Sequence, residues 1–154
     1  MSLLGAIRPD SVNLPLFLHV LGAMLLVGAL ATVASAILAG WGRDERAVGL
    51  TRFALRAIPY GVLPAYVLMR VGAQWTEAEQ DYPDGFEASW LDIGYITADA
   101  GALLLLISIV LAVIGLRKLR SGGGLGLGRA VGIISLILLV AYVVAVWAMT
   151  AKPT

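Results

Sequence analysis

The chain has 154 residues, of which 60% are hydrophobic and 14% are charged, and its net charge is +1. Soluble globular domains carry about 25% charged residues, so this composition excludes an ordinary soluble enzyme, a disordered chain and a nucleic-acid-binding protein. The chain has no cysteine, which excludes disulfides, thiolate metal sites and cysteine nucleophiles. These numbers predict one transmembrane domain, residues 1–154, in an integral membrane protein.

Long stretches without charge divide the chain into four predicted membrane spans. No Asp, Glu, Lys or Arg occurs between Asp10 and Arg43, or within residues 130–151. A spanning helix needs about 20 mostly apolar residues. The second stretch is shorter, with arginines at its ends and with Pro59 and Pro64 inside, where we expect a kink. The predicted spans are residues 13–41, 50–72, 90–117 and 128–150.

Basic residues concentrate in the first and third loops between these spans. The second loop, residues 73–89, is acidic and has no Lys or Arg. Because positively charged loops stay in the cytoplasm, both termini and the acidic loop are expected outside the cell (plasma) membrane. Four short-looped spans predict an all-α fold, an integral membrane four-helix bundle with antiparallel up-down topology. The basic loop residues are Arg43, Arg46 and Arg52 in the first loop, and Arg117, Lys118, Arg120 and Arg129 in the third.

Small residues recur every four positions in the first and fourth spans. Helices in lipid associate through close packing of small residues rather than through the hydrophobic effect. These stripes therefore predict helix contacts, either within one bundle or between subunits, and we expect a homo-oligomer. The residues are Gly28, Thr32, Ala36 and Gly40 in the first span, and Gly128 and Gly132 in the fourth.

Polar side chains at membrane depth are expected to gather in the outer half of the bundle. A charged Asp at a helix centre costs about 2.5–3.5 kcal/mol on insertion scales, and such residues usually face the bundle interior and mark an ion, proton or ligand path. The alternative for Asp99 is a pairing with Arg70 that only locks two helices together. The predicted pocket contains His19, Asp99 and Arg70, with Asp92, Tyr95 and Tyr66 around them.

His19, the only histidine, has several possible roles. An imidazole can bind a metal or haem iron and can relay protons, or it can simply hydrogen-bond a carbonyl in a packed interior. A carboxylate nearby would orient and tune it. Arg70 in turn could bind an anion, a lipid phosphate or a haem propionate, or could anchor its helix at the membrane surface.

The segment Phe17-Leu18-His19-Val20-Leu21-Gly22-Ala23, followed by Val27-Gly28-Ala29, resembles the opening helix of the DUF2269 family of small bacterial membrane proteins. It is similar, more distantly, to copper-resistance CopD-like domains. The ending Trp147-Ala148-Met149-Thr150-Ala151-Lys152-Pro153 also resembles that of DUF2269. Leu26 and Ala29 depart from the family pattern. The CopD-like resemblance implies metal or haem handling at His19.

Three functional hypotheses remain open at this point. The leading one is a transport-like protein whose outward-facing polar pocket binds or passes a small ion, metal or ligand. The second is a redox protein in which His19 ligates haem b, with the other axial histidine supplied by a second copy. The third is a non-catalytic accessory subunit that docks other membrane proteins. None of the three requires enzymatic activity, and no catalytic motif appears in the sequence.

Overall fold

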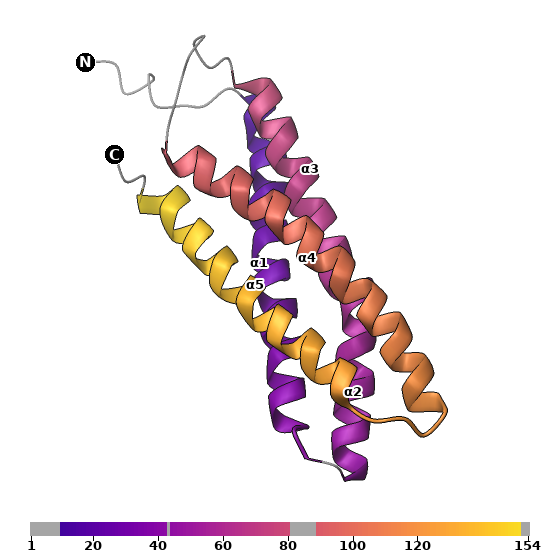
Figure 1. The fold of residues 1–154 in the computed structure, drawn as a ribbon. Coiled ribbons are helices and arrows are strands. Elements are labelled where there is room, and N and C mark those ends of the chain that lie inside the picture. Colours follow the sequence, from indigo (N-terminus) through magenta and orange to yellow (C-terminus); the bar gives the residue numbers. More distant parts are fainter. Residues whose placement is uncertain (1–9, 43, 81–88, 152–154) are drawn as a thin grey trace, which may run out of the picture.

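The computed structural model describes residues 10–42, 44–80 and 89–151, and within these ranges all regular secondary structure is helical. The helices are α1 (Asp10–Ala39), α2 (Glu45–Ala57), η2 (Ile58–Val62), α3 (Leu63–Glu79), α4 (Ser89–Arg120) and α5 (Gly126–Ala151) (Figure 1). Three stretches are long and apolar enough to cross a membrane: Ser11–Ala39, Leu91–Arg120 and Gly126–Ala151. The all-helical prediction is confirmed, and the three stretches indicate a membrane protein.

The second predicted span is not a single α-helix. Its backbone is helical from Glu45 to Glu79, but the five residues Ile58–Val62 form a π-helix between α2 and α3. Pro59 lies inside this stretch and Pro64 lies just after it, and neither has an N–H to donate, so the ordinary bonding pattern fails there. The Leu63 N–H instead donates to the Ile58 carbonyl, one residue further back than in an α-helix. The prolines therefore widen the helix locally.

The helices associate in two close antiparallel pairs, α1 with α3 and α4 with α5. In the first pair, Gly22 lies against Met69 and Gly72 lies against His19. A later residue of α1 therefore contacts an earlier residue of α3, as in an antiparallel pair. α1 also packs on α5 and joins the two pairs (Figure 1). The backbone of α4 lies closer to α2 and η2 than to α3.

Large apolar side chains lie both inside the molecule and on its surface. Leu30, Leu55 and Val131 are among the fully buried ones and belong to one continuous core. Leu106 and Val143 are more than 45% exposed, and similar side chains cover the outer faces of all four long helical segments. A helix that is apolar all round suits a lipid environment, so this surface agrees with the span assignment.

The predicted small-residue stripes are only partly used within the chain. A methyl group added at Gly132 would lie 2.8 Å from Cβ of Ile37, and one added at Gly128 would strike Thr51, so the stripe of α5 packs against α1 and α2. In α1, Ala36 is buried and Gly40 packs against Leu50, whereas Gly28 faces open space and Thr32 is exposed. The predicted homo-oligomer stays a prediction.

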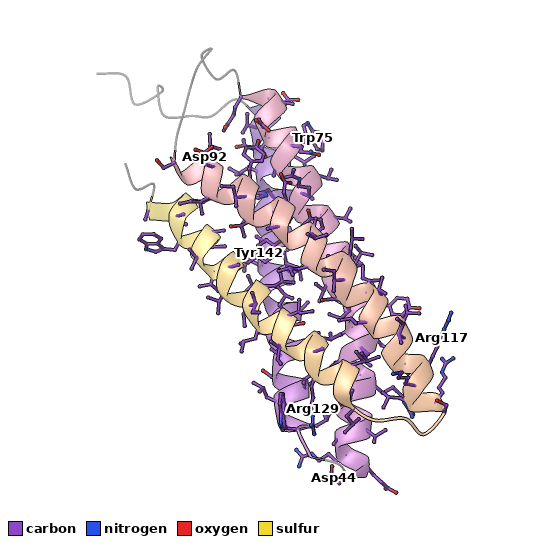
Figure 2. The ribbon with its side chains drawn as sticks, viewed as in Figure 1. Asp44, Trp75, Asp92, Arg117, Arg129 and Tyr142 are labelled. Atoms are coloured by element: carbon purple, nitrogen blue, oxygen red, sulfur yellow. The ribbon has the colours of Figure 1, made fainter. Side chains whose placement is uncertain are left out.

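Charged side chains lie mainly at opposite ends of the molecule. One end, where α3 finishes and α4 begins, carries Glu77, Glu79, Asp92 and Asp99, together with Arg70, and is called the acidic end; Asp92 is labelled there in Figure 2. The other, the basic end, carries Arg46, Arg52, Arg56, Arg117, Lys118, Arg120 and Arg129, together with Asp44 and Glu45. The rest of the predicted acidic loop, residues 81–88, lies outside the described residues.

Candidate functional site

An ion pair between α3 and α4 lies at the centre of the candidate site. Nη2 of Arg70 donates to Oδ1 of Asp99 at 2.8 Å. The Arg70 side chain is 23% exposed and that of Asp99 is 69% exposed. The expectation that Asp99 faces the bundle interior is therefore wrong. Ala98 holds the buried position on this turn of α4, and one residue further the helix has rotated by about 100° toward the surface.

Tyr95 extends this ion pair into a network. Its ring lies 5.6 Å from Cζ of Arg70, and its hydroxyl donates to the carboxylate of Glu77. The sequence pattern groups Tyr95, Arg70 and Asp99 but places Glu77 in a loop. The available signal was the spacing, because Glu77 follows Arg70 by two helical turns and so shares its face. These four residues are called the α3–α4 network.

Tyr66 adds a further link between the same helices. Its hydroxyl donates to the backbone carbonyl of Ala98 at 3.1 Å. Tyr66 precedes Arg70 by four residues and lies on the same face of α3. The predicted grouping of Tyr66 with Arg70 and Asp99 therefore corresponds to one continuous line of polar contacts between α3 and α4.

His19 is separate from this line. Nδ1 of His19 lies 2.9 Å from the Met69 carbonyl oxygen, and because a carbonyl can only accept, Nδ1 carries the proton. This bond joins α1 to α3. Met69 is buried against α1 while its neighbour Arg70 reaches α4, so consecutive residues face different helices. Among the described residues, no contact brings His19 to Asp99 or Arg70.

Asp92 also lies apart, and no metal cluster is assembled. Asp92 is exposed in the first turn of α4, without a hydrogen bond or ion pair to another described residue. The described ranges contain no group of three or more His, Cys, Asp or Glu side chains that could hold a metal ion. No other such side chain in the described ranges joins His19, so a metal or haem there would need further protein ligands from outside these ranges or from another chain.

A row of small residues, missed by the sequence analysis, forms the contact between α4 and α5. Positions seven apart on α4 meet positions seven apart on α5, because Gly94 contacts Met149 and Gly101 contacts Tyr142. The signal was in the sequence as a seven-residue repeat of Gly94, Gly101, Ser108 and Gly115, which is typical of a left-handed helix pair.

Three hydroxyl groups are buried in this contact between α4 and α5, which is called the α4–α5 seam. The same register places Ser108 of α4 opposite Ser135 of α5, and both are fully buried. Tyr142, labelled between α4 and α5 in Figure 2, packs on Gly101. No described residue accepts from or donates to these three hydroxyls. A buried hydroxyl without a partner costs about 1–3 kcal/mol, so the seam contains unused hydrogen-bonding capacity in an otherwise apolar interior.

Comparison with known proteins adds no relative to this description. No family model, no curated protein and no solved structure matches the chain. The resemblance to DUF2269 therefore stays a prediction.

Proposed function

We propose that the chain is an antiparallel four-span bundle of the plasma membrane, with both termini and the acidic end outside. In addition to the three long apolar helices, the second span in chain order is the helical segment from Glu45 to Glu79. The support is the distribution of charge, because the basic end carries both basic loops and cytoplasmic loops are enriched in Lys and Arg. Asp99 and Arg117 are separated by about 27 Å of helix, close to the roughly 30 Å hydrocarbon thickness. The α3–α4 network then lies at the outer membrane boundary.

This orientation has a direct test. Single cysteines at Ser121 and Thr76, introduced into a chain that has none, are expected to react oppositely with a membrane-impermeant maleimide added to intact cells. The position at Thr76 should be labelled from outside, whereas the position at Ser121 should react only after the cells are opened. Labelling of Ser121→Cys in intact cells, with Thr76→Cys protected until lysis, would reverse the proposed topology.

We further propose that the protein passes protons from the acidic end along the α4–α5 seam. The observation that carries this proposal is a set of three buried hydroxyls that have no partner among the described residues, those of Tyr142, Ser108 and Ser135. Hydroxyls both donate and accept, so they can relay protons through hydrogen-bonded chains. The acidic side chains around the α3–α4 network raise the local cation concentration at the entrance.

The hydroxyls do not form a continuous chain by themselves. Tyr142 and Ser135 are separated by seven residues of α5, about 10 Å along the helix axis. Buried waters typically bind polar groups that lack a protein partner, and such waters would complete the relay. Close packing of Tyr142 on Gly101 favours protons over larger hydrated cations. This path differs from the predicted pocket, because Tyr142, Ser108 and Ser135 take the place of His19, Asp99 and Arg70.

Proton movement can be measured in liposomes that contain a pH-sensitive dye and are energised by a potassium gradient with valinomycin. The wild-type protein is expected to acidify the lumen faster than empty liposomes do. Ser108→Ala, Ser135→Ala and Tyr142→Phe should each slow this flux, because each removes a relay group. Ser35→Ala is the matched control, since Ser35 is an exposed serine of α1. Wild-type flux equal to that of empty liposomes, or equal slowing by Ser35→Ala, would refute the proposal.

A further inference from the structure

A cavity at the basic end lies beyond the proposed proton path. Its volume is about 450 Å³, and it is bordered by α2, by the link between α4 and α5, and by the first turns of α5. Val48 and Leu125 supply apolar walls, and Arg129 supplies a positive charge. The remaining lining residues are Gly123, Gly124 and Gly126, which leave backbone groups uncovered by side chains.

Arg129 is held firmly at this cavity by neutral partners. Its Nη2 donates to the carbonyl oxygens of Trp41 at 2.7 Å and Gly42 at 3.4 Å. The guanidinium also lies over the Trp41 ring, 5.2 Å from the ring centre. These contacts fix the orientation of the guanidinium and, because the partners are neutral, do not themselves compensate its charge.

Within the described ranges, Arg129 forms no ion pair with an acidic side chain. The ion pair found in these ranges joins Arg70 to Asp99. Asp44, at the same end of the molecule, caps α2 by accepting from the Ala47 N–H at 2.8 Å. Arg129 is half-buried, and its Nε is buried without a described partner. An unpaired, partly buried cation is costly, so an anion in the cavity would stabilise it.

The surroundings favour an anion that also has an apolar part. The basic end adds Arg46, Arg117 and Lys118 to the field of Arg129. A guanidinium binds phosphate oxygens through its fork of N–H groups. Basic pockets between helices at the cytoplasmic surface suit anionic lipid headgroups, and Val48 and Leu125 offer contact to the glycerol and upper acyl carbons.

We propose that this cavity binds the phosphate group of an anionic phospholipid, with the phosphate on Arg129 and the glycerol region against Val48 and Leu125. The shared chemistry is a phosphate ester at a guanidinium, so free phosphate is the competing source of the ligand. The site is independent of the α4–α5 hydroxyls, so a result that refutes lipid binding would leave the proton proposal unaffected.

The test is native mass spectrometry of the delipidated full chain, titrated with phosphatidylglycerol in neutral detergent. One bound lipid per chain is expected. Arg129→Gln should weaken this binding by about fivefold, since one basic residue at an anionic surface contributes about 1 kcal/mol. Arg120→Gln is the matched control, because it removes the same charge from an exposed position at the same end that does not line the cavity. Equal losses in both variants would mean non-specific surface attraction and overturn the proposal.

Two further experiments address two separate questions. One distinguishes loss of the cavity from loss of folding, and the other identifies the source of the phosphate. Gly124→Leu keeps Arg129 but fills open space at the cavity wall, so it should also weaken lipid binding while leaving the thermal midpoint unchanged. Lipid binding undiminished in a folded Gly124→Leu protein would place the lipid elsewhere. Inorganic phosphate is titrated in parallel. Competition in which inorganic phosphate displaces the lipid at equal concentration would assign the cavity to free phosphate and overturn the lipid assignment.

Discussion

Replacing Gly72 with alanine is expected to lower the free energy of unfolding by about 2–3 kcal/mol, as overpacking of a tight interface does. A methyl group at this position would lie 2.7 Å from Cα of His19, and the backbone nitrogen of His19 would be nearer still. Backbone atoms in a helix cannot rotate aside as a flexible side chain can, so α1 and α3 would have to separate. The measurement is loss of helical circular dichroism during titration with sodium dodecyl sulfate in mixed micelles.

Gly49→Ala is the matched control for this prediction. Gly49 lies inside α2, is exposed, and has nothing within 4 Å of an added methyl group. Alanine should therefore stabilise this position by up to about 1 kcal/mol through its helix propensity. Gly22 touches Met69 in the same contact between α1 and α3. The double variant Gly22→Ala with Gly72→Ala should therefore lose less free energy of unfolding than the two single variants lose together. Equal stability of the Gly72→Ala and Gly49→Ala proteins would contradict the close contact.

Removing both charges of the Arg70–Asp99 ion pair should lower the free energy of unfolding by less than the sum of the two single removals. Asp99→Asn and Arg70→Gln are each expected to lower the free energy of unfolding by about 1–2 kcal/mol, because each leaves a charged partner without its hydrogen bond. The double variant should recover about 1 kcal/mol of the summed loss. This coupling is modest because the Asp99 carboxylate is 69% exposed and is partly screened by solvent.

Asp92 provides the control for this double-mutant cycle. It lies on α4, is exposed, and makes no ion pair with a described residue. Asp92→Asn combined with Arg70→Gln should therefore be additive within about 0.5 kcal/mol. Both cycles use the same denaturant titration. Additivity in the Asp99 cycle as well would show that Arg70 and Asp99 do not interact in the membrane protein.

The long helices could be predicted from the sequence because charge is expensive in lipid. The uncharged runs locate α1, α4 and α5 to within a few residues. The helical segment from Glu45 to Glu79 was harder to predict, since arginines interrupt its apolar run and prolines alter its hydrogen bonding. The continuation of this helix from residue 73 to Glu79 was missed because its acidic residues were assigned to a loop.

The candidate site was predictable in part, for a reason of geometry. Helical spacing grouped Tyr66 with Arg70 and Tyr95 with Asp99, because residues four apart share a face. The direction of each face was not available, since apolar side chains cover these helices all round and do not mark the buried side. For this reason the exposure of Asp99 and the separate position of His19 could not be foreseen.

The pairing of helices has a mechanical consequence. α1 and α3 are joined by backbone contact at Gly22 and Gly72, and α4 and α5 interlock along a seven-residue repeat. Between α3 and α4, by contrast, the connection consists largely of long side chains, those of Arg70, Tyr66 and Tyr95. Side-chain bridges yield to bending far more readily than interlocked backbones do. Close packing of Ile37 on Gly132 joins the two pairs toward the basic end, so the most compliant joint between them lies at the acidic end.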